Sequence, residues 1–94
     1  MQRQLVFRVH ALQAMFRRKI SVEDVQVVLA SGRNIETYPN DQPYPSRLVL
    51  GWRGSRPIHF VVADNEMEQK TVIITVYEPD PNRWEENFER RKKP

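Results

Sequence analysis

This 94-residue sequence contains the histidine, tyrosine and arginine side chains that acid–base chemistry on an RNA phosphodiester needs. Cleavage without a metal requires a group that takes the 2′-hydroxyl proton, a group that protonates the leaving 5′-oxygen, and a cation beside the reacting phosphorus. Histidine and tyrosine can serve as acid or base, and arginine can hold the phosphate. The expected catalytic residues are therefore His10, Arg47, His59 and Tyr77.

Each candidate also has a purely structural reading. Either histidine can be a hydrogen-bonded residue of the core, and Tyr77 can simply pack at the end of a strand. Arg47 can pair with an acid across the sheet, such as Glu78 or Asp80. Residue types alone leave both readings open.

The sequence lacks the residues that other kinds of active site require. The chain contains no cysteine and only two histidines, so a thiolate zinc site or a nucleophilic triad has little support. The glycines stand apart at Gly32, Gly51 and Gly54, and none belongs to a phosphate-binding loop. We expect neither a metal nor a cofactor.

Positive charge is concentrated at the two ends of the chain, although the net charge is only +3. Residues 1–19 carry five basic groups and no acid, whereas residues 20–82 carry five basic and nine acidic groups. This asymmetry favours a polyanion contacted by one surface. We expect Arg17, Arg18 and Lys19, at the end of the first helix, to bind RNA; the alternative is a solvated helix end.

Apolar spacing predicts a first helix over residues 9–19. Val9, Leu12, Met15 and Phe16 form one stripe, and His10 and Arg17 project together two turns apart.

A second helix is expected to begin after Ser21 and to stop at Gly32. Ser21 and Asp24 have the spacing of a capping box, and Ile20 with Val25 fits a hydrophobic staple.

Beyond Gly32 the pattern changes to the period of strands. Strands are predicted at Asn34–Tyr38, Arg47–Arg53, Arg56–Ala63 and Thr71–Tyr77, after a weak strand near the N-terminus. Gly54-Ser55 has the residues of a type II′ hairpin turn, which places Leu50 opposite His59. One face of the hairpin then carries Val49, Ile58, Phe60 and Val62, and we expect it to pack on the helices.

A C-terminal helix is expected from Asp80-Pro81, with Trp84 and Phe88 on one side. The expected fold is α+β: two N-terminal helices on a three- to four-stranded antiparallel meander, followed by that helix. Residues 1–94 should form a single domain, with residues 1–4 and 90–94 frayed. No apolar run suits a membrane span or a secretion signal, so a cytoplasmic protein is expected.

Three stretches resemble a family of small bacterial domains of unknown function that is grouped with the RelE- and BrnT-like toxins of type II toxin–antitoxin systems. The middle stretch is Tyr44–Trp52 and the last is Ile73–Trp84. The first stretch matches at His10, Ala11, Met15, Arg18, Ile20, Ser21, Asp24 and Val25. Together they span nearly the whole chain in the order of that family.

The resemblance implies a RelE-like fold and a metal-free mRNA endonuclease, or interferase, that a cognate antitoxin inhibits. Some similar toxins pair with antitoxins that contain a zinc-binding module and a helix-turn-helix. The resemblance carries no catalytic residue over to this chain, so the roles above rest on chemistry alone. The alternative function is a non-catalytic RelE-like module that binds protein or nucleic acid.

Overall fold

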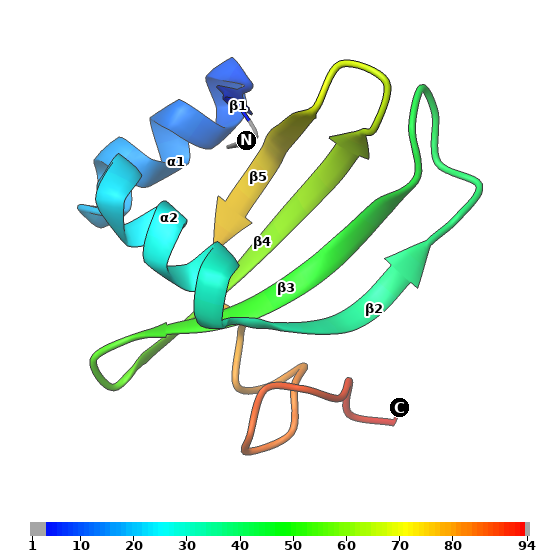
Figure 1. Ribbon diagram of the computed structural model, residues 1–94. Helices are drawn as coiled ribbons and strands as arrows, with labels where there is room; N and C mark the ends of the chain where they lie inside the picture. The colour runs from blue at the N-terminus through cyan, green and yellow to red at the C-terminus, as the bar shows by residue number, and fades with distance from the viewer. Residues whose placement is uncertain (1–3, 94) are drawn as a thin grey trace.

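Two helices lie on one face of a five-stranded sheet in the computed structural model, which describes residues 4–93 (Figure 1). The elements are β1 (Gln4–Phe7), α1 (Val9–Arg18), α2 (Val22–Ser31), β2 (Arg33–Tyr38), β3 (Ser46–Arg53), β4 (Arg56–Asn65) and β5 (Lys70–Tyr77). The expected α+β class is confirmed. Neither helix in the described part of the chain is long and apolar enough to cross a membrane.

The expected antiparallel meander forms with four strands, but it is only part of a five-stranded mixed sheet. The strand order is β1-β5-β4-β3-β2, in which β2 to β5 form an antiparallel meander and β1 pairs with β5 in parallel. The weak N-terminal strand is therefore an edge strand. Parallel pairing needs a long connection, and here the helices and the meander supply it.

The β3–β4 hairpin has the predicted register. Arg53 lies opposite Arg56, and Leu50 lies opposite His59. Gly54 has a φ of 62°, whereas Ser55 is not among the residues with positive φ, as a type II′ turn requires. Since directly opposed residues share a face, this register assigns every side chain of the two strands to the helical or the open side.

The helical face of the sheet carries the main core, as expected. Val49, Ile58, Phe60 and Val62 are buried there against residues of both helices. On α1 the buried residues are Ala11, Ala14 and Met15. The apolar stripe expected from sequence instead points largely outward, since Met15 alone of its four members is buried. Two alanines let α1 lie close to the sheet, which larger side chains would prevent.

Helix α2 begins with the predicted capping box. The Ser21 hydroxyl accepts from the Asp24 backbone N–H at 3.0 Å, and the Asp24 carboxylate accepts from the Ser21 N–H at 2.9 Å. The helix ends at Gly32. Beneath α2 there is no room for a side chain at position 51, because a Cβ added to Gly51 would lie 2.1 Å from Cγ1 of Val28.

The expected C-terminal helix does not form in the described residues. The carbonyl of Asp80 accepts from the backbone N–H groups of Arg83 and Trp84, but the chain then folds back, with Trp84 bridged to Arg91. This segment, orange to red in Figure 1, is a loop beside the sheet. A helix this short is marginal alone, so contacts of Trp84 and Phe88 with the sheet override the helical signals.

Residues 4 and 90–93, which were expected to fray, are among the described residues. The fraying expected for residues 1–4 and 90–94 falls outside the described residues at 1–3 and 94. Gln4 pairs with Lys70 in the sheet, and the Arg91 guanidinium bonds to Glu36.

Candidate functional site

His59 lies on the open face of the sheet and is completely buried. Its Nε2 is 3.0 Å from the backbone carbonyl of Phe88, and its Nδ1 is 3.2 Å from the Tyr77 hydroxyl. A carbonyl can only accept, so Nε2 carries the hydrogen and Nδ1 of the neutral ring accepts from Tyr77. Both ring nitrogens are therefore satisfied by the neutral tautomer.

Two aromatic rings pack against the imidazole of His59. The Trp84 ring contacts the His59 ring edge-on, with 4.5 Å between the ring centroids, and the Tyr77 ring does so with 5.2 Å between the centroids. Burial lowers the pKa of His59, although the bond to Phe88 and the charge of Glu36 work in the opposite direction. Burial likewise raises the pKa of the Tyr77 hydroxyl. The covered His59 is thus uncharged at neutral pH.

An ion pair lies next to His59 on the same face. The guanidinium of Arg91 contacts both carboxylate oxygens of Glu36, at 2.9 Å and 3.2 Å, and the Tyr38 hydroxyl donates to Glu36 at 2.6 Å. Arg91 also stacks 4.7 Å above the ring of Trp84, the residue that touches His59. Trp84 therefore connects the two halves of the site.

The surroundings shift the pKa values of Glu36 and Tyr38 in opposite directions. Burial raises the pKa of Glu36, but the hydrogen bonds from Arg91 and Tyr38 outweigh burial, and the net pKa is lowered. Burial and the bond to Glu36 raise the pKa of Tyr38 to about 12. The Glu36 carboxylate is therefore ionised at neutral pH. We call the set His59, Tyr77, Glu36, Tyr38 and Arg91 the tail-covered cluster.

Sequence reasoning missed three members of the tail-covered cluster. Glu36 and Tyr38 are separated by one residue on β2, and the pairing of Glu36 with Leu48 places both on the face of His59. Alternation along this strand was the available signal. Arg91 gave none, because its contact with Glu36 spans 55 residues and begins in a segment expected to fray.

The other two expected catalytic residues lie elsewhere. Arg47 is on the helical face, where its guanidinium binds the Asp64 carboxylate at 3.0 Å and the Asn34 side-chain oxygen at 2.7 Å. This is the acid-pairing alternative, with Asp64 as the acid. His10 is exposed on α1. Of the four expected residues, the structure brings together only His59 and Tyr77.

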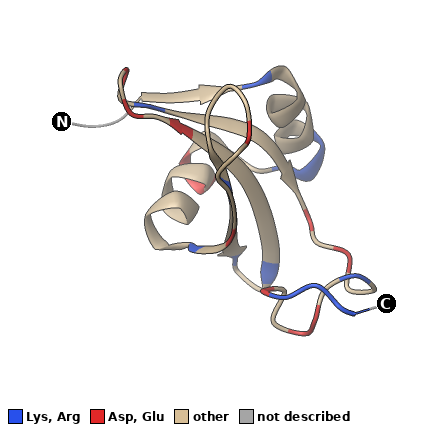
Figure 2. Ribbon diagram, turned by 90° about the vertical axis from the view of Figure 1, so that its right-hand side faces the viewer, with Lys and Arg blue, Asp and Glu red and all other residues tan. Residues whose placement is uncertain are grey.

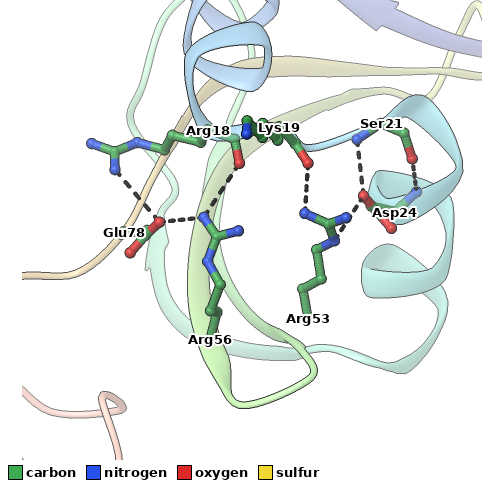
Figure 3. A network of polar contacts seen from close by, with 7 residues as sticks. All are labelled: Arg18, Lys19, Ser21, Asp24, Arg53, Arg56 and Glu78. Carbon is green, nitrogen blue, oxygen red and sulfur yellow. Dashed lines mark hydrogen bonds and ion pairs between the residues drawn. The ribbon is translucent and has the colours of Figure 1, made fainter.

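The expected RNA-binding residues at the end of α1 are largely engaged in holding the fold together (Figure 3). The Arg18 side chain pairs with Glu78 at 3.7 Å, and the Arg18 carbonyl accepts from Arg56 at 3.3 Å. Arg56 also pairs with Glu78. These contacts tie the helix end to the β3–β4 hairpin.

Lys19 contributes through its backbone. It closes α1 in the left-handed conformation, and its carbonyl accepts from Arg53 at 2.6 Å (Figure 3). Arg53 also pairs with Asp24 of α2 at 3.2 Å. Arg17 projects from the exposed side of α1. Among these three residues, Arg18 is therefore the one whose side chain is engaged in this network.

The C-terminal segment, which supplies Arg91 to the tail-covered cluster, is rich in basic residues. Figure 2 shows blue along the end of this segment and at both ends of α1. The segment contributes Arg90, Arg91, Lys92 and Lys93. Within residues 4–93, no three metal-binding side chains gather into a site. The available chemistry is an imidazole, a carboxylate, two phenols and a guanidinium.

A protein-family model matches residues 7–78. The chain belongs to the DUF4258 family, a domain of unknown function. The DUF4258 match places the chain in a family without assigning it a reaction or connecting it to RelE- or BrnT-like toxins. It covers four members of the tail-covered cluster but stops before Arg91 and the rest of the covering segment. Comparison with curated proteins and with solved structures finds no match.

Proposed function

We propose that this DUF4258 domain is a metal-independent endoribonuclease of the toxin–antitoxin kind, with RNA as its substrate and the tail-covered cluster as its active site. The observation that carries the proposal is the shared face of His59 and the Glu36–Arg91 pair. An imidazole, a carboxylate and a guanidinium are the groups that cleavage through the 2′-hydroxyl needs.

The proposed reaction is a transesterification. Glu36 takes the proton of the 2′-hydroxyl while the 2′-oxygen bonds to phosphorus and the bond from phosphorus to the 5′-oxygen breaks. His59 gives a proton to that 5′-oxygen, and Arg91 faces the non-bridging oxygens. The products are a 2′,3′-cyclic phosphate and a 5′-hydroxyl. Tyr77 donates to Nδ1 of the neutral His59 ring and accepts from Nδ1–H of the protonated ring, so it orients the ring in both states.

The described conformation is a resting one under this proposal. His59 is buried and neutral, so it lacks the proton that the leaving group needs. Moving Trp84 and Phe88 away from His59, while Arg91 stays beside Glu36, removes the burial, and a bound phosphate favours the protonated ring. The same phosphate competes with Glu36 for Arg91 and frees the carboxylate to act as base. The basic end of the segment attracts the polyanion.

The test is cleavage of a short fluorescent RNA by the full chain in EDTA, with mass spectrometry of the ends. We expect a cyclic phosphate, and we expect His59→Gln and Glu36→Gln to lower the rate by about 100-fold or more. His10→Gln and Arg47→Gln are the matched controls and should cleave normally. Circular dichroism checks that every variant folds. No cleavage by the folded wild type, free or on ribosomes, contradicts the proposal.

The toxin part of the proposal has a separate readout. Induction of the wild-type chain should arrest bacterial growth, whereas His59→Gln should not. Co-expression with the neighbouring gene product should restore growth if that product is the cognate antitoxin. Growth arrest that persists in His59→Gln would place the toxicity outside the tail-covered cluster.

A second candidate function is a non-catalytic binding module, and the apolar residues exposed on α1 favour it. Such a module would bind RNA or protein without producing new ends. Salt-dependent RNA binding with no cleavage, unchanged in His59→Gln, is the result that selects it.

A further inference from the structure

Three large apolar side chains stand exposed in a line along α1. Val9 is 68% exposed, Leu12 is 46% exposed and Phe16 is 87% exposed. At 100° per residue, these positions project within about 60° of one another on the helix surface. We call this set the α1 stripe.

The α1 stripe lies outside the buried core of the described residues. The opposite side of the helix already carries the core contacts, through Ala11, Ala14 and Met15. Leu12 and Phe16 also line an open hollow together with Gln13 and Arg17. Single exposed apolar residues are common, but an aligned set beside a hollow is typical of a binding surface.

The surroundings of the α1 stripe are basic. Arg8 precedes the helix and Arg17 lies in its last turn, one on each side of the stripe by the helical angle, and α1 contains no acid. Neither guanidinium has an ion pair within residues 4–93, whereas Arg18 is turned toward Glu78. The stripe is therefore flanked by positive charge that the fold leaves uncompensated.

This charge pattern argues against a second copy as the occupant. An antiparallel pair of α1 helices would bring Arg8 of each copy toward Arg17 of the other, and a parallel pair would align identical charges. Like charges across an interface disfavour association. A partner with acidic groups at the borders of an apolar face matches both the exposed apolar side chains of the stripe and the arginines that flank it.

We propose that the α1 stripe is a docking surface for an acidic amphipathic helix of another protein. Apolar residues of that helix would pack on Val9, Leu12 and Phe16, and its carboxylates would pair with Arg8 and Arg17. The stripe lies on the helical layer, whereas the tail-covered cluster lies on the other face of the sheet. The inference therefore does not rest on ribonuclease activity.

The test uses a fluorescent synthetic peptide with leucines on one helical face and glutamates along both borders. Titrated with the full chain, it should bind saturably, and Phe16→Ser should weaken binding by about 10-fold or more. Val27→Ser is the matched control, because Val27 is 62% exposed on α2, and it should leave binding unchanged. A peptide with lysines in place of the glutamates should bind at least about 10-fold more weakly.

Several results overturn the inference. These are no saturable binding, equal binding of the lysine peptide, or no loss in Phe16→Ser. Phe16-dependent binding to vesicles of phosphatidylcholine and phosphatidylserine would assign the surface to a membrane instead. A dimer in analytical ultracentrifugation that Phe16→Ser abolishes would assign it to a second copy. Because Phe16 is almost fully exposed, its replacement should not disturb folding, which circular dichroism verifies.

Discussion

Nε2 of His59 donates a hydrogen bond of 3.0 Å to the backbone carbonyl of Phe88, which lies 29 residues further along the chain. Phe88 has a φ of 60°, a left-handed conformation that a bulky residue rarely adopts. The surrounding contacts must therefore hold this turn in place. The position of the C-terminal segment and the protonation of His59 are consequently coupled.

This coupling predicts that acidification destabilises the fold. Burial holds the pKa of His59 below its ordinary value of 6.5, so the unfolded chain binds more protons as the pH falls below that value. Stability should be full above pH 6.5 and should decrease toward the folded pKa. Urea unfolding followed by tryptophan fluorescence between about pH 7.5 and about pH 5.5 measures this slope.

Comparing His59→Gln with His10→Gln shows which histidine causes the pH dependence of stability in that experiment. His10 is exposed, so His10→Gln should keep the slope, whereas His59→Gln should flatten it. The range stays above the ordinary pKa of Glu36, 4.5, so this carboxylate does not contribute. A slope that survives His59→Gln and disappears in His10→Gln would contradict the assignment.

Arg91 should stabilise the C-terminal segment more than its neighbour Arg90 does. Arg91→Ala removes the bonds to Glu36 and the contact with Trp84, and it should lower the free energy of unfolding by about 1 kcal/mol. It should also speed cleavage after Phe88 by chymotrypsin. Arg90→Ala is the control, since the exposed Arg90 side chain has no hydrogen bond or ion pair within residues 4–93. Equal acceleration in both variants would show that Arg91 does not anchor the segment.

Local signals predicted the parts of the fold that neighbouring residues determine. The capping box of Ser21 and Asp24 needs only residues three apart, and the Gly54-Ser55 turn fixes the hairpin register. That register correctly placed His59 and Leu50 on the side away from the helices. The His59–Tyr77 contact was not predicted, because it depends on the register of β4 with β5, which places the two residues opposite each other.

Contacts between distant segments lay beyond sequence reasoning. The capping signals at Asp80 favour a helix. They could not reveal that packing Trp84 and Phe88 on the sheet stabilises the segment more than helix formation does. For α1, spacing identified an amphipathic helix but not which side faces the core. Hydrophobicity favoured the stripe that contains Phe16, whereas close packing selected Ala11 and Ala14.

The capping box should contribute measurably to stability. Ser21→Ala leaves the Asp24 backbone N–H without its side-chain acceptor and should lower the free energy of unfolding by about 1 kcal/mol. Ser21→Asn retains an acceptor and should recover most of that loss. Urea unfolding at neutral pH compares the variants. An alanine variant as stable as wild type would show that solvent replaces the cap without loss.

The contact between Gly51 and Val28 predicts a rescue by a second substitution. A Cβ at position 51 would lie 2.1 Å and 2.8 Å from the two methyl groups of Val28, so Gly51→Ala should lower stability by about 1–3 kcal/mol. Val28→Ala removes both methyls and opens space below α2. The double variant should therefore be more stable than the sum of the single effects predicts.

Gly54→Ala provides the control for this cycle. Nothing lies within 4 Å of a Cβ at position 54, but the φ of 62° disfavours any side chain. This variant should lose about 1 kcal/mol through backbone strain alone. Because the strain is local, Val28→Ala should not relieve it, and the two losses should simply add. Additivity at position 51 as well would mean that the backbone of α2, not the methyls of Val28, adjusts to the added side chain.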